Sequence, residues 1–144
     1  MRVRDVMTDV VLTVGPEHTI RQVAELMAAW RVGSAVVHDP EASGTGIMTE
    51  RDVLCVIGRG LDPDLERVTN HMTWDVVFAG PHWTLDEAAA TMVRGGFRHL
   101  IVLDGKEILG IVSVRDLMRA WSTAHARESI PDTVRAGGIR TLSA

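Results

Sequence analysis

Apolar residues change their spacing along the first part of the chain, and this change predicts a strand followed by a helix. The β-branched stretch from Val10 to Val14 ends at Gly15-Pro16, a pair typical of a turn. Thr19 then stands where a helix N-cap is expected. Apolar residues follow it at helical spacing, namely Ile20, Val23, Ala24, Met27 and Ala28. The pattern therefore indicates strand, turn and helix in that order.

The next stretch completes one structural unit. Ser34 to Val37 has the continuous apolar character of a buried strand, and a polar loop from Asp39 to Thr45 follows it. Gly46 to Met48 predicts a further short strand, after which helical spacing returns from Asp52 to Val56. One unit therefore has the order β-α-β-β-α.

The same order of elements recurs in the second part of the chain. The matching positions, 65 residues apart, are Met7-Thr8 with Met72-Thr73, Gly15-Pro16 with Gly80-Pro81, Thr19-Ile20 with Thr84-Leu85, Met27 with Met92, and Asp39 with Asp104. After Asp39 the first copy has one extra loop residue, so later positions match at a spacing of 64. The expected elements are strands at Asp75 to Phe78, Leu100 to Leu103 and Ile108 to Val112, helices at Leu85 to Val93 and Val114 to Ala126, and a tight turn at Asp104-Gly105. The chain is thus an internal duplication.

This duplication predicts the fold class and the domain organisation. Each half alone would expose an apolar face, so we expect an α+β fold in which two β-α-β-β-α repeats pack face to face with pseudo-twofold symmetry, leaving clefts at their junction. Residues 1–60 form the first repeat, and residues 61–126 form the second together with a linking helix that begins at Asp62-Pro63. Residues 127–144 contain Pro131 and Gly137-Gly138 and predict a mobile or partner-bound tail.

Composition narrows the possible functions. The chain carries 15 basic and 19 acidic residues, a net charge of −4 without a long run of either sign, which argues against a nucleic-acid partner. The single cysteine, Cys55, excludes an intrachain disulfide and favours a cytoplasmic location. No apolar run approaches the ~20 residues of a membrane helix, so no membrane partner is expected. No nucleophile elbow, P-loop or metal-ligand spacing is visible, so we expect neither an enzyme nor a metal site.

One short motif occurs twice, each time between a predicted strand and a predicted helix. It consists of Gly46, Thr49 and Asp52 in the first copy and of Gly110, Ser113 and Asp116 in the second. A hydroxyl and free N–H groups at a helix N-terminus favour a phosphate, and an aspartate can accept both hydroxyls of a ribose. The same spacing is also that of a capping box with Asp in place of Glu or Gln, so a purely structural cap is the alternative.

These residues carry a resemblance to a known family. With the Met-Thr pair that begins each copy, the segments Gly33-Ser34-Ala35-Val36-Val37 and Phe97-Arg98-His99-Leu100, and the duplication itself, the chain resembles tandem CBS-domain proteins, or Bateman modules, of the stand-alone type from about Val3 to Trp121. The resemblance implies that AMP, ADP or ATP is the ligand, with apolar strand residues around the adenine. It assigns Asp52 and Asp116 to the ribose and Thr49 and Ser113 to the phosphate, one pair in each cleft.

Two basic residues extend this assignment. The resemblance places Arg98 and His99 opposite the phosphates, and arginine suits such recognition because its guanidinium is a planar fork of donors. Their counterparts in the first copy are Gly33 and Ser34, so we expect one cleft to be richer in positive charge. The alternative is a solvated surface Arg98 and a partly buried His99 with its hydrogen bonds satisfied.

The function implied by the resemblance is regulatory. Binding of an adenine nucleotide would shift the arrangement of the halves or of two subunits in a homodimer, and an unknown protein partner would respond in trans. Trp30 and Trp121, near the ends of matching helices, fit a dimer interface. Two alternatives stay open: a non-sensing dimeric scaffold whose clefts are empty or filled by side chains, and a binder of another adenosyl compound or of nucleic acid.

Overall fold

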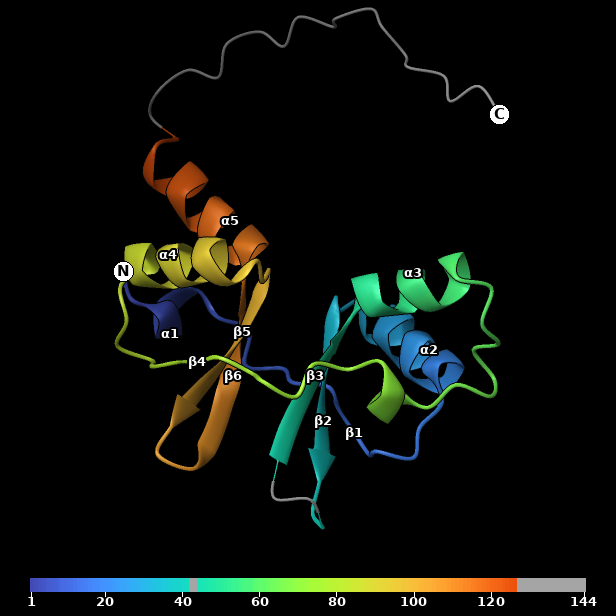
Figure 1. The fold of residues 1–144 in the computed structure, drawn as a ribbon. Helices are drawn as coiled ribbons and strands as arrows, with labels where there is room; N and C mark the ends of the chain where they lie inside the picture. Colours follow the sequence, from blue (N-terminus) through green and yellow to red (C-terminus); the bar gives the residue numbers. More distant parts are fainter. Residues whose placement is uncertain (42–43, 127–144) are drawn as a thin grey trace, which may run out of the picture.

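The computed structural model describes residues 1–41 and 44–126, and in it two similar halves face each other (Figure 1). Each half contains a three-stranded sheet, with strand order β1-β2-β3 in the first and β4-β5-β6 in the second. The predicted α+β fold is confirmed. The predicted tail, residues 127–144, lies outside the described residues.

The first half contains β1 (Thr13–Val14), α2 (Ile20–Trp30), β2 (Ser34–Asp39), β3 (Gly44–Thr49) and α3 (Glu50–Gly58). Strand β1 pairs with β2 in parallel because α2 forms the crossover between them, whereas β2 and β3 are antiparallel. The predicted unit of strand, helix, two strands and helix is therefore present.

The second half repeats this plan with β4 (Phe78–Ala79), α4 (Leu85–Gly95), β5 (His99–Asp104), β6 (Glu107–Ser113) and α5 (Val114–Ala124). The predicted tight turn between β5 and β6 is confirmed, because Gly105 has φ 59°, a left-handed value that suits glycine. Helix α5 ends two residues before the predicted end at Ala126.

Threonine caps begin the corresponding helices α2 and α4. The Thr19 hydroxyl accepts from the Gln22 N–H at 3.2 Å, and the Thr19 N–H donates to the Gln22 side chain at 2.9 Å. Thr84 and Glu87 form the same reciprocal pair at 3.1 and 2.8 Å. The predicted cap at Thr19 is thus confirmed, and it satisfies backbone donors that the helix itself leaves free.

The first strand of each half is shorter than predicted, with β1 at Thr13–Val14 and β4 at Phe78–Ala79. The chain before each of these strands bonds to the other half. Thr8 exchanges two backbone hydrogen bonds of 2.9 Å with Ile111 on β6, and Thr73 exchanges bonds of 2.9 and 3.0 Å with Ile47 on β3. A Cβ at Gly110 would lie 2.4 Å from the Thr8 carbonyl oxygen. The motif glycine is therefore what admits the crossing chain.

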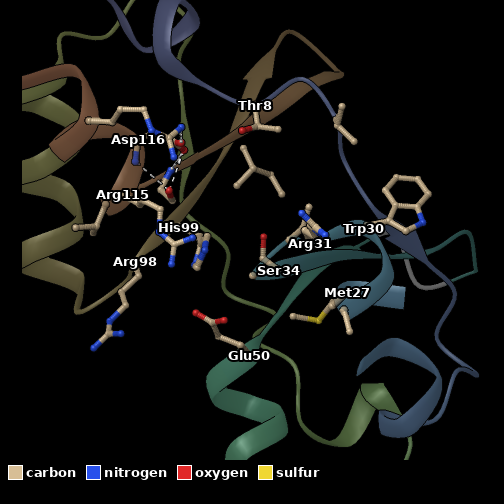
Figure 2. Close-up of a pocket in the computed structure, with 18 of the residues that line it drawn as sticks. Thr8, Met27, Trp30, Arg31, Ser34, Glu50, Arg98, His99, Arg115 and Asp116 are labelled. Carbon is tan, nitrogen blue, oxygen red and sulfur yellow. Dashed lines mark hydrogen bonds and ion pairs between the residues drawn. The ribbon is translucent and has the colours of Figure 1, made fainter. Parts of the chain in front are cut away.

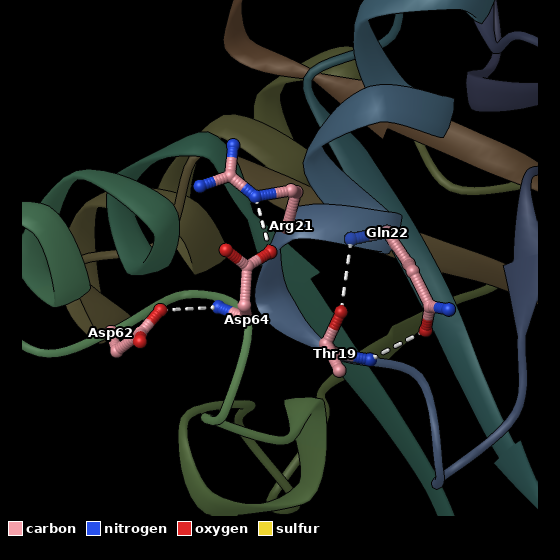
Figure 3. Close-up of polar contacts among 5 residues, drawn as sticks. All are labelled: Thr19, Arg21, Gln22, Asp62 and Asp64. Atoms are coloured by element: carbon pink, nitrogen blue, oxygen red, sulfur yellow. Dashed lines mark hydrogen bonds and ion pairs between the residues drawn. The ribbon is translucent and has the colours of Figure 1, made fainter.

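The linking segment is not the predicted helix. It consists of a turn and one 3-10 turn, η1 (Val68–Asn70), held against the start of α2. The Ile20 and Arg21 N–H groups donate to the carbonyls of Glu66 and Pro63 at 2.9 and 3.0 Å, and the Arg21 guanidinium pairs with Asp64 (Figure 3). Linker carbonyls thus satisfy helical donors that would otherwise require water.

A short helix that the sequence did not predict, α1 (Val3–Val6), has the equivalent place in the second half. The Val3 N–H donates to the Trp83 carbonyl at 2.9 Å, as the Val68 N–H donates to the His18 carbonyl at 2.9 Å. Val3 belongs to the core of the second half and Val68 to the core of the first. Each half therefore takes in the segment that precedes the other repeat in the chain.

A third apolar cluster joins the two sheets. Val36 and Ile47 are opposite each other on β2 and β3, and Ile101 and Ile111 are opposite each other on β5 and β6. All four are buried against one another and form the contact between the halves. This cluster confirms the predicted face-to-face packing about a pseudo-twofold axis. Within the described chain, no helix combines the length and the apolar character needed to cross a membrane.

Candidate functional site

A cavity of about 1530 Å³ opens between the two halves (Figure 2). One wall is formed by the end of α2 and the beginnings of β2 and α3, and the other by the beginnings of β5 and α5. Thr8, Val10 and Ile111 add a largely apolar corner. The cavity therefore brings together elements of both repeats.

The six residues predicted for the site fall into two groups. Arg98, His99, Ser113 and Asp116 all line the cavity. Thr49 and Asp52 do not line it, although they begin α3 as Ser113 and Asp116 begin α5. The structure thus gathers the residues of the second copy and leaves the motif of the first copy outside.

Ser113 and Asp116 form a closed pair at the start of α5. The Ser113 N–H and hydroxyl donate to Asp116 Oδ2 at 2.7 and 2.8 Å, and the Asp116 N–H donates to the Ser113 hydroxyl at 3.2 Å. The capping box considered from sequence is therefore present. Asp116 Oδ1 makes no hydrogen bond within the described part of the chain and lies 3.9 Å from Arg119 Nη1, so one carboxylate oxygen caps and the other can accept from a ligand.

Thr49 and Asp52 form a similar pair at the start of α3. The Thr49 N–H donates to Asp52 Oδ2 at 2.8 Å, and the Thr49 hydroxyl lies 3.2 Å from the same oxygen. Both motifs therefore act as caps, and the cap by itself does not distinguish a binding motif from a structural one.

The backbone ties the basic residues to the motif. The Val114 N–H, the first of α5, donates to the Arg98 carbonyl at 2.9 Å, and the Glu50 N–H of α3 donates to the Gly33 carbonyl at 3.1 Å. Because each helix start is bonded to the residue before a central strand, Arg98 and Ser113 lie at the same edge of the cavity. Arg98 is exposed there. Its exposure fits both a phosphate-binding role and the alternative of a solvated surface arginine.

His99 lies at the base of the cavity, where the two halves meet. Its Nε2 is 3.4 Å from the position of a Cβ on Gly33, and the Glu50 carboxyl carbon is 3.5 Å from that point. Its Nδ1 is buried without a hydrogen-bond partner among the described residues, so the expectation of a satisfied histidine is not met. Burial lowers the pKa of His99 below its ordinary 6.5; Glu50 and Asp116 oppose this, and Arg98 and Arg115 add to it.

The cavity is rich in positive charge although the chain as a whole is acidic. Four arginines line it, Arg31, Arg98, Arg115 and Arg119, against the two carboxylates of Glu50 and Asp116. Sequence reasoning identified only Arg98. Arg115 and Arg119 could have been found from their places within and one turn after the second motif, whereas Arg31 and Glu50 come from the other half and gave no local signal.

Two other features of the described residues concern metal binding and the environment of the single cysteine. Within 1–41 and 44–126, no group of three or more histidine, cysteine, aspartate or glutamate side chains could hold a metal ion. Cys55, which stands in an apolar run of the sequence, is exposed on α3 rather than buried.

Comparison with known proteins agrees with this geometry. The chain matches the family model of the CBS domain twice, over residues 3–59 and 65–123. An uncharacterized 17.7 kDa protein of Acidianus ambivalens is 35% identical over 129 residues, which cover 88% of this chain and 77% of that protein. The CBS-domain containing protein ATU1752 from Agrobacterium tumefaciens has a similar structure, with a TM-score of 0.76, 34% identity, and coverage of 84% of this chain and 99% of the other.

A further solved structure, of the CBS domain protein PAE2072 from Pyrobaculum aerophilum complexed with AMP, has a TM-score of 0.75 and 26% identity. The similarity covers 89% of this chain and 100% of that one. The repeat seen in the sequence, the paired motifs and the two matches of the family model all describe the same units. The chain belongs to the CBS-domain family and contains two CBS domains in tandem.

Proposed function

We propose that this protein is a regulatory module, rather than an enzyme, that binds AMP, ADP or ATP in the cavity between its halves. One observation carries the proposal: a motif aspartate, one oxygen of which accepts no hydrogen bond from the described residues, shares a single cavity with four arginines. A ribose and a phosphate chain require acceptors and cationic donors close together, as they are here.

Each part of a nucleotide has a counterpart in the cavity. Asp116 Oδ1 accepts from the ribose hydroxyls, while Oδ2 holds the side chain in place through Ser113. The start of α5, with Arg98 and Arg115 beside it, takes the phosphates, because a helix N-terminus and guanidinium groups both favour negative charge. The adenine lies against the corner that contains Val10.

A relative supports this ligand class. PAE2072, which has the same fold at 26% identity, was solved in complex with AMP. In the present chain a nucleotide would touch both halves, since Arg31 and Glu50 come from one half and Arg98 and Asp116 from the other. A ligand in contact with both walls can shift their arrangement only through its differential affinity for the alternatives, which is how a regulatory site acts.

The response would pass to a second copy and to a partner protein through the helices. Leu54 and Ile57 on α3 are 67% and 55% exposed, and Met118 and Trp121, at the matching positions of α5, are 61% and 37% exposed. Apolar side chains on two symmetry-related helices form a self-complementary surface of the kind used in homodimers. We therefore propose a homodimer formed through α3 and α5.

A second function is favoured by one feature of the cavity. The Glu50 carboxylate lies near His99 and would repel a phosphate placed at the base. With the exposed helices this suits a dimeric scaffold that binds no nucleotide, the alternative that the sequence also left open.

The discriminating experiment is calorimetric titration of nucleotide-free protein with AMP, ADP and ATP, with GTP and S-adenosylmethionine as comparisons. We expect saturable binding of the adenine nucleotides at micromolar concentration and none of GTP. Stronger binding of S-adenosylmethionine would point to another adenosyl ligand. Absence of heat with every compound, for protein shown to be folded and free of ligand, would contradict the proposal and favour the scaffold.

A further inference from the structure

The two halves differ sharply at the ends of α2 and α4. Both helices end at a residue with left-handed backbone, Arg31 with φ 55° and ψ 42° and Gly96 with φ 70° and ψ 23°. Glycine adopts this conformation freely, whereas a side chain with a Cβ is strained in it. Arg31 is the one non-glycine residue with positive φ within residues 1–41 and 44–126. The pair Trp30-Arg31 thus stands where the second half has Gly95-Gly96.

No hydrogen bond or ion pair within the described chain accounts for an arginine at this position. The Arg31 side chain is exposed, and none of the ion pairs found up to 4.0 Å among residues 1–41 and 44–126 involves it. Its backbone N–H caps the helix through the Ala28 carbonyl at 3.2 Å, a bond that any residue other than proline could make. No hydrogen bond or ion pair of the side chain among the described residues therefore offsets the strain.

The side chain lies where an anion would be held. Arg31 lines the cavity beside Trp30, on the wall opposite Arg98 and Arg115 (Figure 2). A fourth guanidinium in one cavity adds repulsion to the backbone strain, and an anionic ligand between the walls would relieve that repulsion. Because strained residues occur where a site requires them, the outlier points to a role in binding.

We propose that Arg31 is the residue by which the first half binds the phosphates of the nucleotide. The inference rests on the proposed function and extends it: the phosphate chain spans from Arg98 and Arg115 on one wall to Arg31 on the other. Arg31 then determines specificity, because it distinguishes phosphorylated nucleotides from adenosine. It also makes affinity depend on how far apart the two halves stand.

The test exploits the opposite effects expected on binding and on stability. Arg31→Gly restores the residue type found at Gly96, so the variant should melt at or above the temperature of the parent protein. Its affinity for ATP and AMP should fall by about tenfold or more, the loss expected for a charge-assisted hydrogen bond. Affinity for adenosine, measured by competition with AMP, should stay within about twofold, since adenosine lacks the phosphate.

Two further variants serve as matched controls. Arg59→Gly removes an exposed arginine at the end of α3, in the same half but outside the cavity, and should leave all affinities unchanged. Arg31→Lys keeps the charge without the planar fork and should restore part of the ATP affinity. This rescue would not occur if Arg31 acted only on the backbone.

Several outcomes would overturn the inference and are distinguishable from failure of the proposed function. Unchanged ATP affinity in Arg31→Gly, or an equal loss for adenosine and ATP, would remove the role of Arg31 while leaving nucleotide binding intact. If Arg59→Gly lost as much ATP affinity as Arg31→Gly, the loss would be explained by the change in net charge alone. Absence of nucleotide binding by the parent protein would reject the proposed function, and the role of Arg31 with it.

Discussion

The two halves of the molecule share one backbone plan but face each other with different side chains. Thr8 bonds to Ile111 as Thr73 bonds to Ile47, with distances between 2.9 and 3.0 Å in both halves. At the cavity, however, Arg98, His99 and Arg119 correspond to Gly33, Ser34 and Cys55. Residues that set the backbone are alike in the two repeats, whereas residues that would meet a ligand differ.

This difference argues that the two motifs are unequal as nucleotide-binding sites. The motif of the second copy lies in the charged cavity with Val10 as an apolar neighbour, and the position that matches Val10 in the second copy is Asp75. A carboxylate is a poor neighbour for an apolar base edge and repels phosphates. We therefore expect a nucleotide to bind more tightly at Ser113 and Asp116 than at Thr49 and Asp52.

The largest expected effect is a difference in stability between alanine substitutions at the two motif glycines, Gly110 and Gly46. A Cβ on Gly110 would lie 2.4 Å from the Thr8 carbonyl oxygen, so Gly110→Ala must displace backbone. At Gly46 the nearest atom is the flexible Met72 sulfur at 2.8 Å, which can move. Urea unfolding should show a loss of about 3 kcal/mol for Gly110→Ala and about 1 kcal/mol for Gly46→Ala. Equal losses would show that the crossing segments are not held as described.

The next largest effect concerns the N-caps of α2 and α4, a feature in which the two halves are alike. Thr19→Ala and Thr84→Ala each remove a reciprocal cap with nearly identical distances, so each should lower the free energy of unfolding by about 1 kcal/mol. Thr91→Ala, which removes a hydroxyl in the middle of α4, serves as a control and should change stability much less. A cost confined to one of the two caps would contradict the shared plan.

The smallest effect concerns His99, whose counterpart Ser34 does not titrate. Because burial lowers the pKa of His99, the unfolded chain binds the proton more readily, and stability falls as pH drops below 6.5. Above pH 6.5 the contribution is fully present. The charged groups around the ring are Glu50, Asp116, Arg98 and Arg115.

The measurement for His99 is urea unfolding at pH 5.5 and 7.5 for the parent protein and for His99→Gln. The other histidines are common to both proteins, so the double difference isolates His99. The variant should lose less stability on acidification than the parent protein. An identical loss would show that His99 is not buried as a neutral ring.

The sequence predicted the parts of the fold that depend on local pattern. The duplication, the strands, the N-cap at Thr19 and the motif at the start of α5 follow from residue spacing and turn chemistry. The linker and α1 were not predicted, because their hydrogen bonds run to distant segments, those of the linker to the start of α2 and that of Val3 to Trp83. Propensity alone does not reveal such partners.

The candidate site shows the same division. Arg98 and Asp116 were predicted because the motif and the repeat align them, whereas Arg31 and Glu50 reach the cavity only through the packing of one half on the other. Their sequence neighbours do not indicate which way the two halves face. Pairing of residues across two walls is a tertiary property, and it is also the property on which the proposed ligand depends.

The most direct test of the account is calorimetric titration of AMP and ATP into Asp116→Ala and Asp52→Ala. Each variant loses the carboxylate of a capping box, so both should lose about 1 kcal/mol of stability and serve as matched controls for each other. The account predicts that Asp116→Ala weakens nucleotide binding by about 1–3 kcal/mol, the scale of a lost hydrogen bond to a charged group, while Asp52→Ala leaves the tighter site nearly unchanged. Equal weakening by both variants, or no weakening by Asp116→Ala, would contradict the inequality of the two motifs and the assignment of the ribose to Asp116.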